Sequence, residues 1–279
     1  GGGPGQMPAP EVGVFPVVAE PVNLTLELVG RTAPYRIAEV RPQVGGIIKS
    51  REYREGGQIT AGEVLYQIDP ARYQAARDSA EAALVRARAT MARARMKAER
   101  YANLVKNKAV SQEDFDDAEA ALKEAAASVQ VAEAALTAAR IELEYTRIAA
   151  PIDGRIGRST VTQGALVTAN QEMALATVQQ LDPIHVDLTQ SAAQQLRLRR
   201  DLEDGRLQRA DDEHPRVTLV LEDGSTYPHE GRLEFAEVSV DPGTGTVTLR
   251  ATFPNPEHIL LPGMFVRAQV EEGTRQNAI

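Results

Sequence analysis

The chain of 279 residues has no cysteine and no tryptophan, and only 4% of its residues are aromatic. A chain without cysteine can form neither a disulfide framework nor a thiolate metal site. The scarcity of aromatic side chains argues against a large aromatic-lined ligand pocket. No apolar run approaches the ~18 residues of a membrane-spanning helix, and the net charge of −8 argues against a non-specific nucleic-acid binder. No signal-peptide pattern is present, which indicates a mature or trimmed sequence.

Small and apolar residues recur in steps of three and four between residues 73 and 146. This heptad spacing is typical of a coiled coil rather than of a helix that lies on a globular core. On both arms a large side chain alternates with alanine over much of the length, which lets two backbones approach closely. The first arm, broken only at Arg77, comprises Tyr73, Ala80, Leu84, Ala87, Met91, Ala94, Ala98, Tyr101 and Val105. The second comprises Phe115, Ala118, Leu122, Ala125, Val129, Ala132, Leu136, Ala139, Leu143 and Thr146.

A short polar segment, Lys106-Asn-Lys-Ala-Val110, separates the two arms. Ser111 follows it as a candidate N-cap, with Asp114 three residues later as in a capping box. Residues 70–108 contain ten Lys or Arg and three acids, whereas residues 111–146 contain nine acids and two bases. Opposite charges favour an antiparallel pair, although an exposed ion pair is worth only about 0–1 kcal/mol. We expect an α-helical hairpin over residues 73–146, about 50 Å long, that projects from the rest of the chain.

An internal repeat flanks this hairpin. Val44-Gly-Gly-Ile-Ile48 matches Ile152-Asp-Gly-Arg-Ile156 at an offset of 108 residues, and Gly56 matches Gly164 at the same offset. The two copies also end alike, in Ile-Asp-Pro70 and Leu-Asp-Pro183. Two equivalent strand-rich halves predict one β-sandwich with two-fold pseudosymmetry over residues 38–72 and 147–181. Its turns are expected at the matched glycines Gly46, Gly56, Gly154 and Gly164.

Stretches with strand-like alternation, bounded by glycine, proline and aspartate turns, lie on the outer flanks of the repeat. One amphipathic helix, residues 191–204, is expected among them and should end at Gly205. Short strands with one helix predict a small β-barrel, residues 182–267, completed by residues 30–37. Residues 1–10 are rich in glycine and proline and predict a flexible tether. The expected strands are residues 12–15, 22–29, 184–188, 216–221, 231–240, 245–253 and 264–271.

Five motifs, in the right order along the chain, resemble one protein family. The motifs are Arg41-Pro-Gln-Val-Gly-Gly-Ile-Ile48, Leu65-Tyr-Gln-Ile-Asp-Pro70, Ala150-Pro-Ile-Asp-Gly-Arg-Ile-Gly157, Ala176-Thr-Val-Gln-Gln-Leu-Asp-Pro183 and Leu261-Pro-Gly-Met-Phe-Val266. They are similar to those of the periplasmic adaptor proteins, or membrane fusion proteins, of tripartite multidrug efflux pumps of the resistance–nodulation–division (RND) type, and above all to the AcrA/MexA group of that family. The resemblance extends from about residue 11 to residue 279.

The resemblance implies an elongated multidomain α+β protein, with a coiled-coil hairpin on a lipoyl-like β-sandwich, a small β-barrel and a β-rich membrane-proximal domain. Residues 11–29 and 268–279 would be part of that last domain, which we expect to continue past Ile279. In this family the hairpin tip engages a TolC-type outer-membrane channel. The family's tip motif is an Arg, a Leu four residues on and a Ser seven beyond that, and Arg100, Leu104 and Ser111 match it. A plain helical hairpin could also use such residues as a surface charge, a closing contact and an N-cap.

The resemblance further implies that the barrel and membrane-proximal domains engage an inner-membrane, proton-driven RND transporter, with six adaptors around the pump axis and hinges near Ala38 and Pro183. Members that are lipoproteins begin with an acylated cysteine; this chain lacks one, and we expect a lipid anchor upstream of Gly1. The implied location is the periplasm of a Gram-negative bacterium, at the inner membrane, and the implied role is non-enzymatic drug efflux, a cause of antibiotic resistance.

Other functions would each need residues that this sequence does not place suitably. A lipoyl or biotinyl carrier presents a lysine on a tight turn between the half-motifs, where this chain has its hairpin. The four histidines, His185, His214, His229 and His258, show no ligand or catalytic spacing, so no metal, cofactor or enzymatic activity is expected. A coiled-coil scaffold would leave the repeat unexplained. The main rival is an adaptor of an ABC-type exporter or of a type I secretion system, although a secretion adaptor usually has a much longer hairpin.

Overall fold

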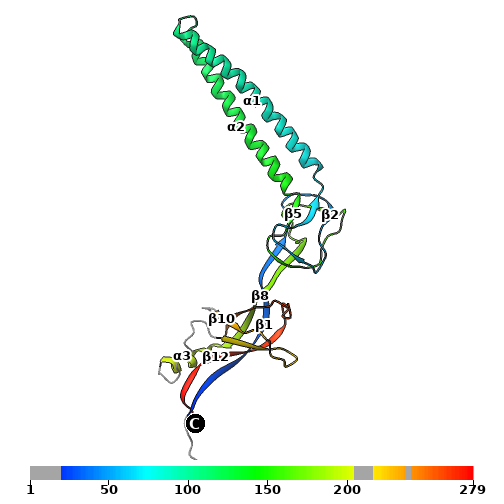
Figure 1. The fold of residues 1–279 in the computed structure, drawn as a ribbon, viewed down its shortest axis with the longest axis vertical. Coiled ribbons are helices and arrows are strands. Elements are labelled where there is room, and N and C mark those ends of the chain that lie inside the picture. The colour runs from blue at the N-terminus through cyan, green and yellow to red at the C-terminus, as the bar shows by residue number, and fades with distance from the viewer. Residues whose placement is uncertain (1–19, 204–215, 237–239, 279) are drawn as a thin grey trace, which may run out of the picture. The chain divides into compact units, whose positions relative to one another are not determined.

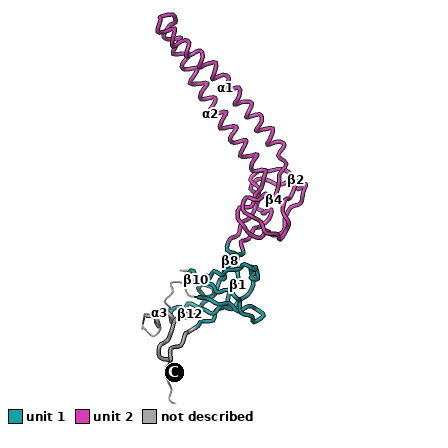
Figure 2. Tube along the Cα trace, viewed as in Figure 1, with its two compact units in different colours: residues 1–35, 181–279 teal, residues 36–180 magenta. Residues whose placement is uncertain are grey.

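The computed structural model describes residues 20–203, 216–236 and 240–278, which form two compact units (Figures 1 and 2). Unit 1 consists of residues 1–35 and 181–279, and unit 2 of residues 36–180. The strands β1 (Glu20–Val40) and β8 (Ala176–Ser191) each contribute to both units. The segments expected as hinges, near Ala38 and Pro183, lie inside these strands rather than in loops. The expected tether at 1–10, the strand at 12–15 and the helix end at Gly205 lie outside the described residues.

Unit 1 is a β-barrel with one helix, as the sequence predicts. The strand order is β1-β12-β9-β10-β11-β8, and a further pairing of β1 with β8 closes it. The last strand extends to Ala278, beyond the predicted end at residue 271, because its partner β1 continues to Glu20. The helix α3 (Ala192–Glu203) begins where the Gln194 N–H donates to Ser191 Oγ at 3.2 Å. The other strands are β9 (Arg216–Val220), β10 (Gly231–Ala236), β11 (Thr246–Phe253) and β12 (Phe265–Ala278).

The barrel core follows from strand alternation. Along β11 every second residue is buried, which is the period of a strand with one face on a core. One polar side chain, that of Asn255, is fully buried here, and its amide nitrogen donates to the carbonyl oxygens of Leu181 and Leu260, both at 2.9 Å. A buried amide is tolerated because these bonds replace those lost to water. The core residues include Ile184, Val186, Leu188, Val217, Leu219, Phe253, Leu260 and Val266.

Unit 2 contains a β-sandwich whose two halves exchange strands. One sheet has the order β5-β4-β2-β7, and in the other β3 and β6 join the first residues of β8. The strands β2, β3 and β4 come from the first copy of the repeat, and β6, β7 and β8 from the second, so each sheet contains both copies. The bounds are β2 (Gly46–Arg51), β3 (Gln58–Ile59), β4 (Val64–Ile68), β5 (Arg147–Ala149), β6 (Gly154–Ile156) and β7 (Leu166–Val167).

The exchange obeys the predicted pseudosymmetry at the level of single residues. Gly46 pairs with Val167, and their equivalents 108 residues away, Gly154 and Ile59, pair in the same way. The turns match as well, because the Gly164 N–H donates to the Ile48 carbonyl at 2.8 Å and the Gly56 N–H donates to that of Ile156 at 3.0 Å. The repeat in the sequence is therefore a repeat of backbone pairing.

The two helices of unit 2 form the predicted antiparallel hairpin, which extends away from the sandwich (Figure 2). They are α1 (Ala71–Lys106) and α2 (Gln112–Glu144). Every residue of the two predicted stripes is buried or half-buried. Leu84, Val129 and Leu136 form a core between the helices, and Arg88 on α1 pairs with Glu133 on α2 at 2.7 Å. The seam holds the hairpin together along its length by side-chain packing.

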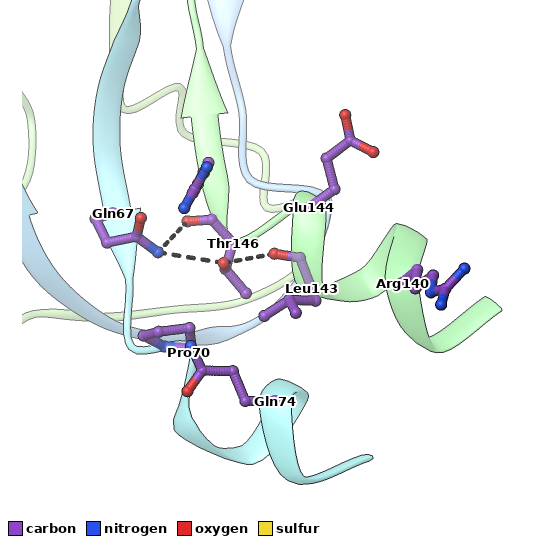
Figure 3. A pocket seen from close by; sticks show the side chains of 8 residues that line it. Gln67, Pro70, Gln74, Arg140, Leu143, Glu144 and Thr146 are labelled. Carbon is purple, nitrogen blue, oxygen red and sulfur yellow. Dashed lines mark hydrogen bonds between the residues drawn. The ribbon is translucent and has the colours of Figure 1, made fainter. Parts of the chain in front are cut away.

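The base of the hairpin is fastened to the sandwich. Tyr73 is buried in the sandwich core, and its hydroxyl donates to the Gly45 carbonyl at 2.7 Å. Where α2 ends, Gln67 Nε2 donates to the carbonyl oxygen and Oγ1 of Thr146, both at 3.2 Å (Figure 3). A groove of about 400 Å³ opens beside these bonds, with Arg140 and Arg147 in its lining. These contacts tie both helix ends to the sheet.

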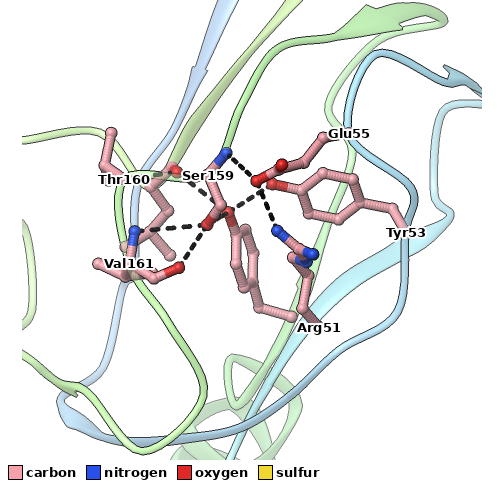
Figure 4. A network of polar contacts seen from close by, with 8 residues as sticks. Arg51, Tyr53, Glu55, Ser159, Thr160 and Val161 are labelled. Carbon is pink, nitrogen blue, oxygen red and sulfur yellow. Dashed lines mark hydrogen bonds and ion pairs between the residues drawn. The ribbon is translucent and has the colours of Figure 1, made fainter.

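A buried hydroxyl network joins the two halves of the sandwich (Figure 4). The Tyr66 hydroxyl lies 2.6 Å from that of Tyr53 and 2.7 Å from Ser159 Oγ, and it donates to the Leu175 carbonyl at 3.0 Å. Burial raises the pKa of Tyr66, so this side chain stays a neutral hydrogen-bonding group. At the rim, Glu55 accepts from the Ser159 N–H at 2.8 Å. Residues from both copies of the repeat thus share one polar cluster.

Candidate docking site at the hairpin tip

The tip begins where α1 stops at Lys106. The Lys108 N–H donates to the Val105 carbonyl and the Ala109 N–H donates to the Leu104 carbonyl, both at 3.0 Å. This pair of hydrogen bonds is the Schellman motif, which satisfies carbonyl oxygens that the helix end leaves without partners. The chain then reverses within residues 107–111, and α2 begins at Gln112. The turn is therefore closed by backbone bonds of its own.

Ser111 is the N-cap of α2, as predicted. Its hydroxyl accepts from the Asp114 N–H at 3.1 Å, and the Asp114 carboxylate accepts from the Ser111 backbone N–H at 3.3 Å, so the capping box is complete. The Ser111 hydroxyl also donates to Asp114 Oδ2 at 2.6 Å. These bonds from the side chain and backbone of Ser111 hold the pKa of Asp114 below its usual value. The serine thus fixes the start of the second helix.

Arg100 and Leu104 lie one helical turn apart near the end of α1, and residues four apart share a helix face. Leu104 is half-buried and Arg100 is exposed. Among the hydrogen bonds and ion pairs of the described residues, none involves the Arg100 side chain. A guanidinium with its donors available beside a partly exposed leucine can bind carbonyl or carboxylate groups next to an apolar contact. The structure thus brings all three predicted tip residues to the distal end of the hairpin.

The four predicted glycines lie in the sandwich, at the other end of unit 2. Gly56 and Gly164 have φ angles of +72° and +88°, a region that favours glycine. Gly46 and Gly154 lie where another chain segment passes close by, since a Cβ on Gly154 would meet the Gln179 carbonyl oxygen. These residues shape the platform that carries the hairpin and take no part in the tip.

Within residues 20–203, 216–236 and 240–278, no group of three or more His, Cys, Asp or Glu side chains is placed to hold a metal ion. No helix in the described part of the chain has the length and hydropathy to cross a membrane. His185 is buried and bonds Thr252 through Nδ1 at 2.9 Å, while His229 pairs with Glu257 at 3.0 Å. His214 lies outside the described residues.

Along the sequence, a long antiparallel hairpin separates the two halves of a strand-exchanged sandwich, and the segments before and after the sandwich form a β-barrel. This order defines the membrane fusion class of protein. One family model, for the barrel-sandwich hybrid domain of RND membrane fusion proteins, matches residues 36–179, and another, for their β-barrel domain, matches residues 183–274. The chain belongs to the RND membrane fusion protein family.

Named relatives agree with this assignment. The chain is 55% identical over 270 residues to the multidrug resistance protein MexA of Pseudomonas aeruginosa, covering 97% of this chain and 67% of MexA. It is 53% identical over 274 residues to the multidrug efflux pump subunit AcrA of Escherichia coli (strain K12), covering 98% of this chain and 68% of AcrA. A crystal structure of a MacA–MexA chimeric protein with the P. aeruginosa MexA α-hairpin domain is similar at a TM-score of 0.62 and 25% identity, covering 93% of this chain and 83% of that one.

Sequence reasoning missed two features of unit 2. One is the left-handed backbone of Lys108 in the turn, at a φ of +55°. Its signal would have been the absence of glycine between Lys106 and Ser111, which leaves another residue to take the helix-ending conformation. The other is the Tyr66 network, which a strand pattern does not reveal because Tyr53, Tyr66 and Ser159 are far apart in the sequence.

Proposed function

We propose that this chain is the periplasmic adaptor subunit of a tripartite multidrug efflux pump, linking an inner-membrane RND transporter to a TolC-type outer-membrane channel. The observation that carries the proposal is the hairpin: a stiff paired-helix rod, fastened at its base by Tyr73 and Gln67, whose distal end presents Arg100 and Leu104. Identities of 53% and 55% to the efflux subunit AcrA and to MexA support the RND type over an ABC-type exporter or a type I secretion system.

In this proposal the role is mechanical and non-enzymatic. The hairpin holds the tip at a fixed distance from the sandwich, while Leu104 fills an apolar groove on the channel and Arg100 binds polar groups beside it. Ser111 holds the two helix ends in register and faces the same partner. The barrel would contact the transporter, together with a membrane-proximal domain that the outer ends of β1 and β12 would enter. Six copies around the pump axis and an acyl anchor at the inner membrane complete the assembly.

The direct test is crosslinking in cells from a photoreactive residue at position 104. A matched probe at Val131, whose side chain is 71% exposed on the shaft of α2, controls for chance contact. We expect capture of a TolC-type channel from position 104 and none from position 131. Equal capture from both positions, or none from position 104, would contradict docking through the tip.

A functional test separates docking from folding. Leu104→Asp and Arg100→Glu should abolish drug efflux and leave the helical content unchanged, because both side chains are outside the helix–helix core. Arg93→Glu is the matched control, since Arg93 is another exposed arginine of α1, on the shaft. Full efflux by the tip variants would remove the tip from the mechanism.

A further inference from the structure

The turn of the hairpin contains a residue in an unfavourable backbone conformation. Among the described residues, three that are not glycine have a positive φ, namely Lys108 at +55°, Asn170 at +54° and His258 at +53°. Asn and His are enriched in the left-handed region, whereas lysine pays the full steric cost of its Cβ there. Lys108 is therefore the least expected of the three.

Lys108 also occupies the position where glycine suits a helix end best. It is the first residue beyond the C-cap Asn107, and its N–H makes one of the two Schellman bonds. Glycine is the usual residue at this place because it adopts the left-handed conformation without strain. A strained residue at a surface turn points to a role outside the fold, since the fold alone would be served better by glycine.

The Lys108 ammonium makes no bond within the described part of the chain. Lys108 and Lys106 are both exposed, and no hydrogen bond or ion pair there involves the Lys106 ammonium either. Of the acidic side chains in the first two turns of α2, Asp114 bonds Ser111 and Asp116 accepts from Gln112 Nε2 at 2.9 Å, while Glu113 and Asp117 are exposed. Two exposed ammonium groups thus lie on the turn, next to the positive N-terminal end of the α2 dipole, without an ion-pair partner among the described residues.

We propose that Lys108 is a specificity-determining contact of the docking tip, which binds a carboxylate on the outer-membrane channel. This inference rests on the proposed function, because it requires that the tip docks at all. In the Schellman turn the left-handed backbone fixes the direction of the Lys108 Cα–Cβ bond, along which the side chain leaves the hairpin. Leu104 and Arg100 would supply the apolar and bidentate contacts, and Lys108 would select channels whose facing surface is acidic. An ion pair at the rim of an interface acts mainly on association rate and partner choice.

The test uses the full chain and the TolC-type channel of Escherichia coli, purified in detergent, with binding measured from low to high salt. Lys108→Asn and Lys108→Gly remove the charge and relieve the backbone strain. Both should weaken binding about two- to fivefold at low salt, as expected for an exposed ion pair, and the difference should vanish at high salt. Their melting temperatures should be unchanged or higher than that of the wild type.

Three further variants make the result specific. Lys108→Arg keeps the charge and should bind like the wild type, whereas Lys108→Glu should bind more weakly than Lys108→Gly. Lys123→Asn removes an exposed lysine from the shaft, whose side chain is 73% exposed, and should bind like the wild type. If Lys108→Asn binds with the affinity and salt dependence of the wild type while Leu104→Asp does not bind, the inference about Lys108 is wrong and the docking tip stands. If Leu104→Asp binds as well as the wild type, or if the wild type does not bind, the proposed function fails and the inference fails with it.

Discussion

The two halves of the sandwich have the same backbone pairing and differ in the side chains on their surfaces. On the outer face next to Gly46, Ile47 pairs with Leu166, and these side chains are 50% and 74% exposed. The equivalent pair in the other half is Arg155 with Gln58. Buried positions, by contrast, keep their character, since Ile48 and Ile156 are both 1% exposed. Burial and close backbone approach thus preserve the repeat, whereas the solvent face has diverged.

A second difference lies at the paired glycines. Gly46 and Gly154 have nearly the same φ, 159° and 153°, so a side chain would strain both backbones alike. Their neighbours differ. A Cβ on Gly46 would meet the Cγ2 methyl of Ile68 at 2.6 Å, whereas a Cβ on Gly154 would meet the backbone carbonyl of Gln179. Ile68 is fully buried, so its methyl can yield only by a small rotation of the side chain, but the Gln179 carbonyl belongs to a strand that is paired with β6.

We expect the largest loss of stability from alanine substitutions at these paired glycines. Gly154→Ala should lower the free energy of unfolding by about 3 kcal/mol and Gly46→Ala by less, about 2 kcal/mol, because each adds a clash to the backbone strain. The reason is that only Gly154 faces backbone. Urea unfolding followed by circular dichroism measures both. Equal losses would show that the two halves tolerate a side chain alike and that the neighbouring strand can shift.

Removal of the hydroxyl that joins the halves should have the next largest effect. Tyr66→Phe leaves Ser159 Oγ, the Tyr53 hydroxyl and the Leu175 carbonyl without their shared partner in a buried site. The loss of unfolding free energy should be about 1–3 kcal/mol. Ser159→Ala, which keeps the Tyr66 bonds to Tyr53 and Leu175, serves as the milder control. A Tyr66→Phe protein as stable as the wild type would mean that the cluster adds nothing to the cohesion of the two halves.

These features also show how far the sequence alone reaches. The heptad stripe and the Ser111 cap follow from local spacing, and the structure confirms them. Of the four matched glycines expected at turns, Gly56 and Gly164 lie in turns, whereas Gly46 and Gly154 begin the strands β2 and β6. The exchange of strands, by which Gly46 meets Val167 and Gly154 meets Ile59, depends on which copy each short strand pairs with. Two-residue strands carry no signal for that choice. The tip assignment of Arg100 and Leu104 came from family likeness, because an exposed arginine and a half-buried leucine look ordinary in any hairpin.

Alanine substitutions at the two turn glycines should destabilise the protein by the same amount. Gly56→Ala and Gly164→Ala each place a Cβ on a left-handed backbone, and neither Cβ would clash, since the nearest atom to the first is 3.9 Å away and nothing lies within 4 Å of the second. Each variant should therefore lose about 1–2 kcal/mol of unfolding free energy through backbone strain alone. Denaturation midpoints of the two proteins should agree closely. A clear difference would show that one turn matters more than its twin.

The smallest effect is expected on the solvent face, where the two halves already differ. Ile47→Arg combined with Leu166→Gln gives this pair the side chains of its equivalent, Arg155 with Gln58, and both positions are at least half exposed. Unfolding free energy should change by no more than about 0.5 kcal/mol, as for most surface substitutions. The reverse exchange is not its mirror image, because Arg155 Nε donates to the Gly56 carbonyl at 2.9 Å and its loss would loosen that turn. Arg155→Ile should therefore cost more than Ile47→Arg. If the polar pair instead lowers the free energy of unfolding, then Ile47 and Leu166 contribute packing to the fold. In that case stability has limited which side chains the two surfaces can carry.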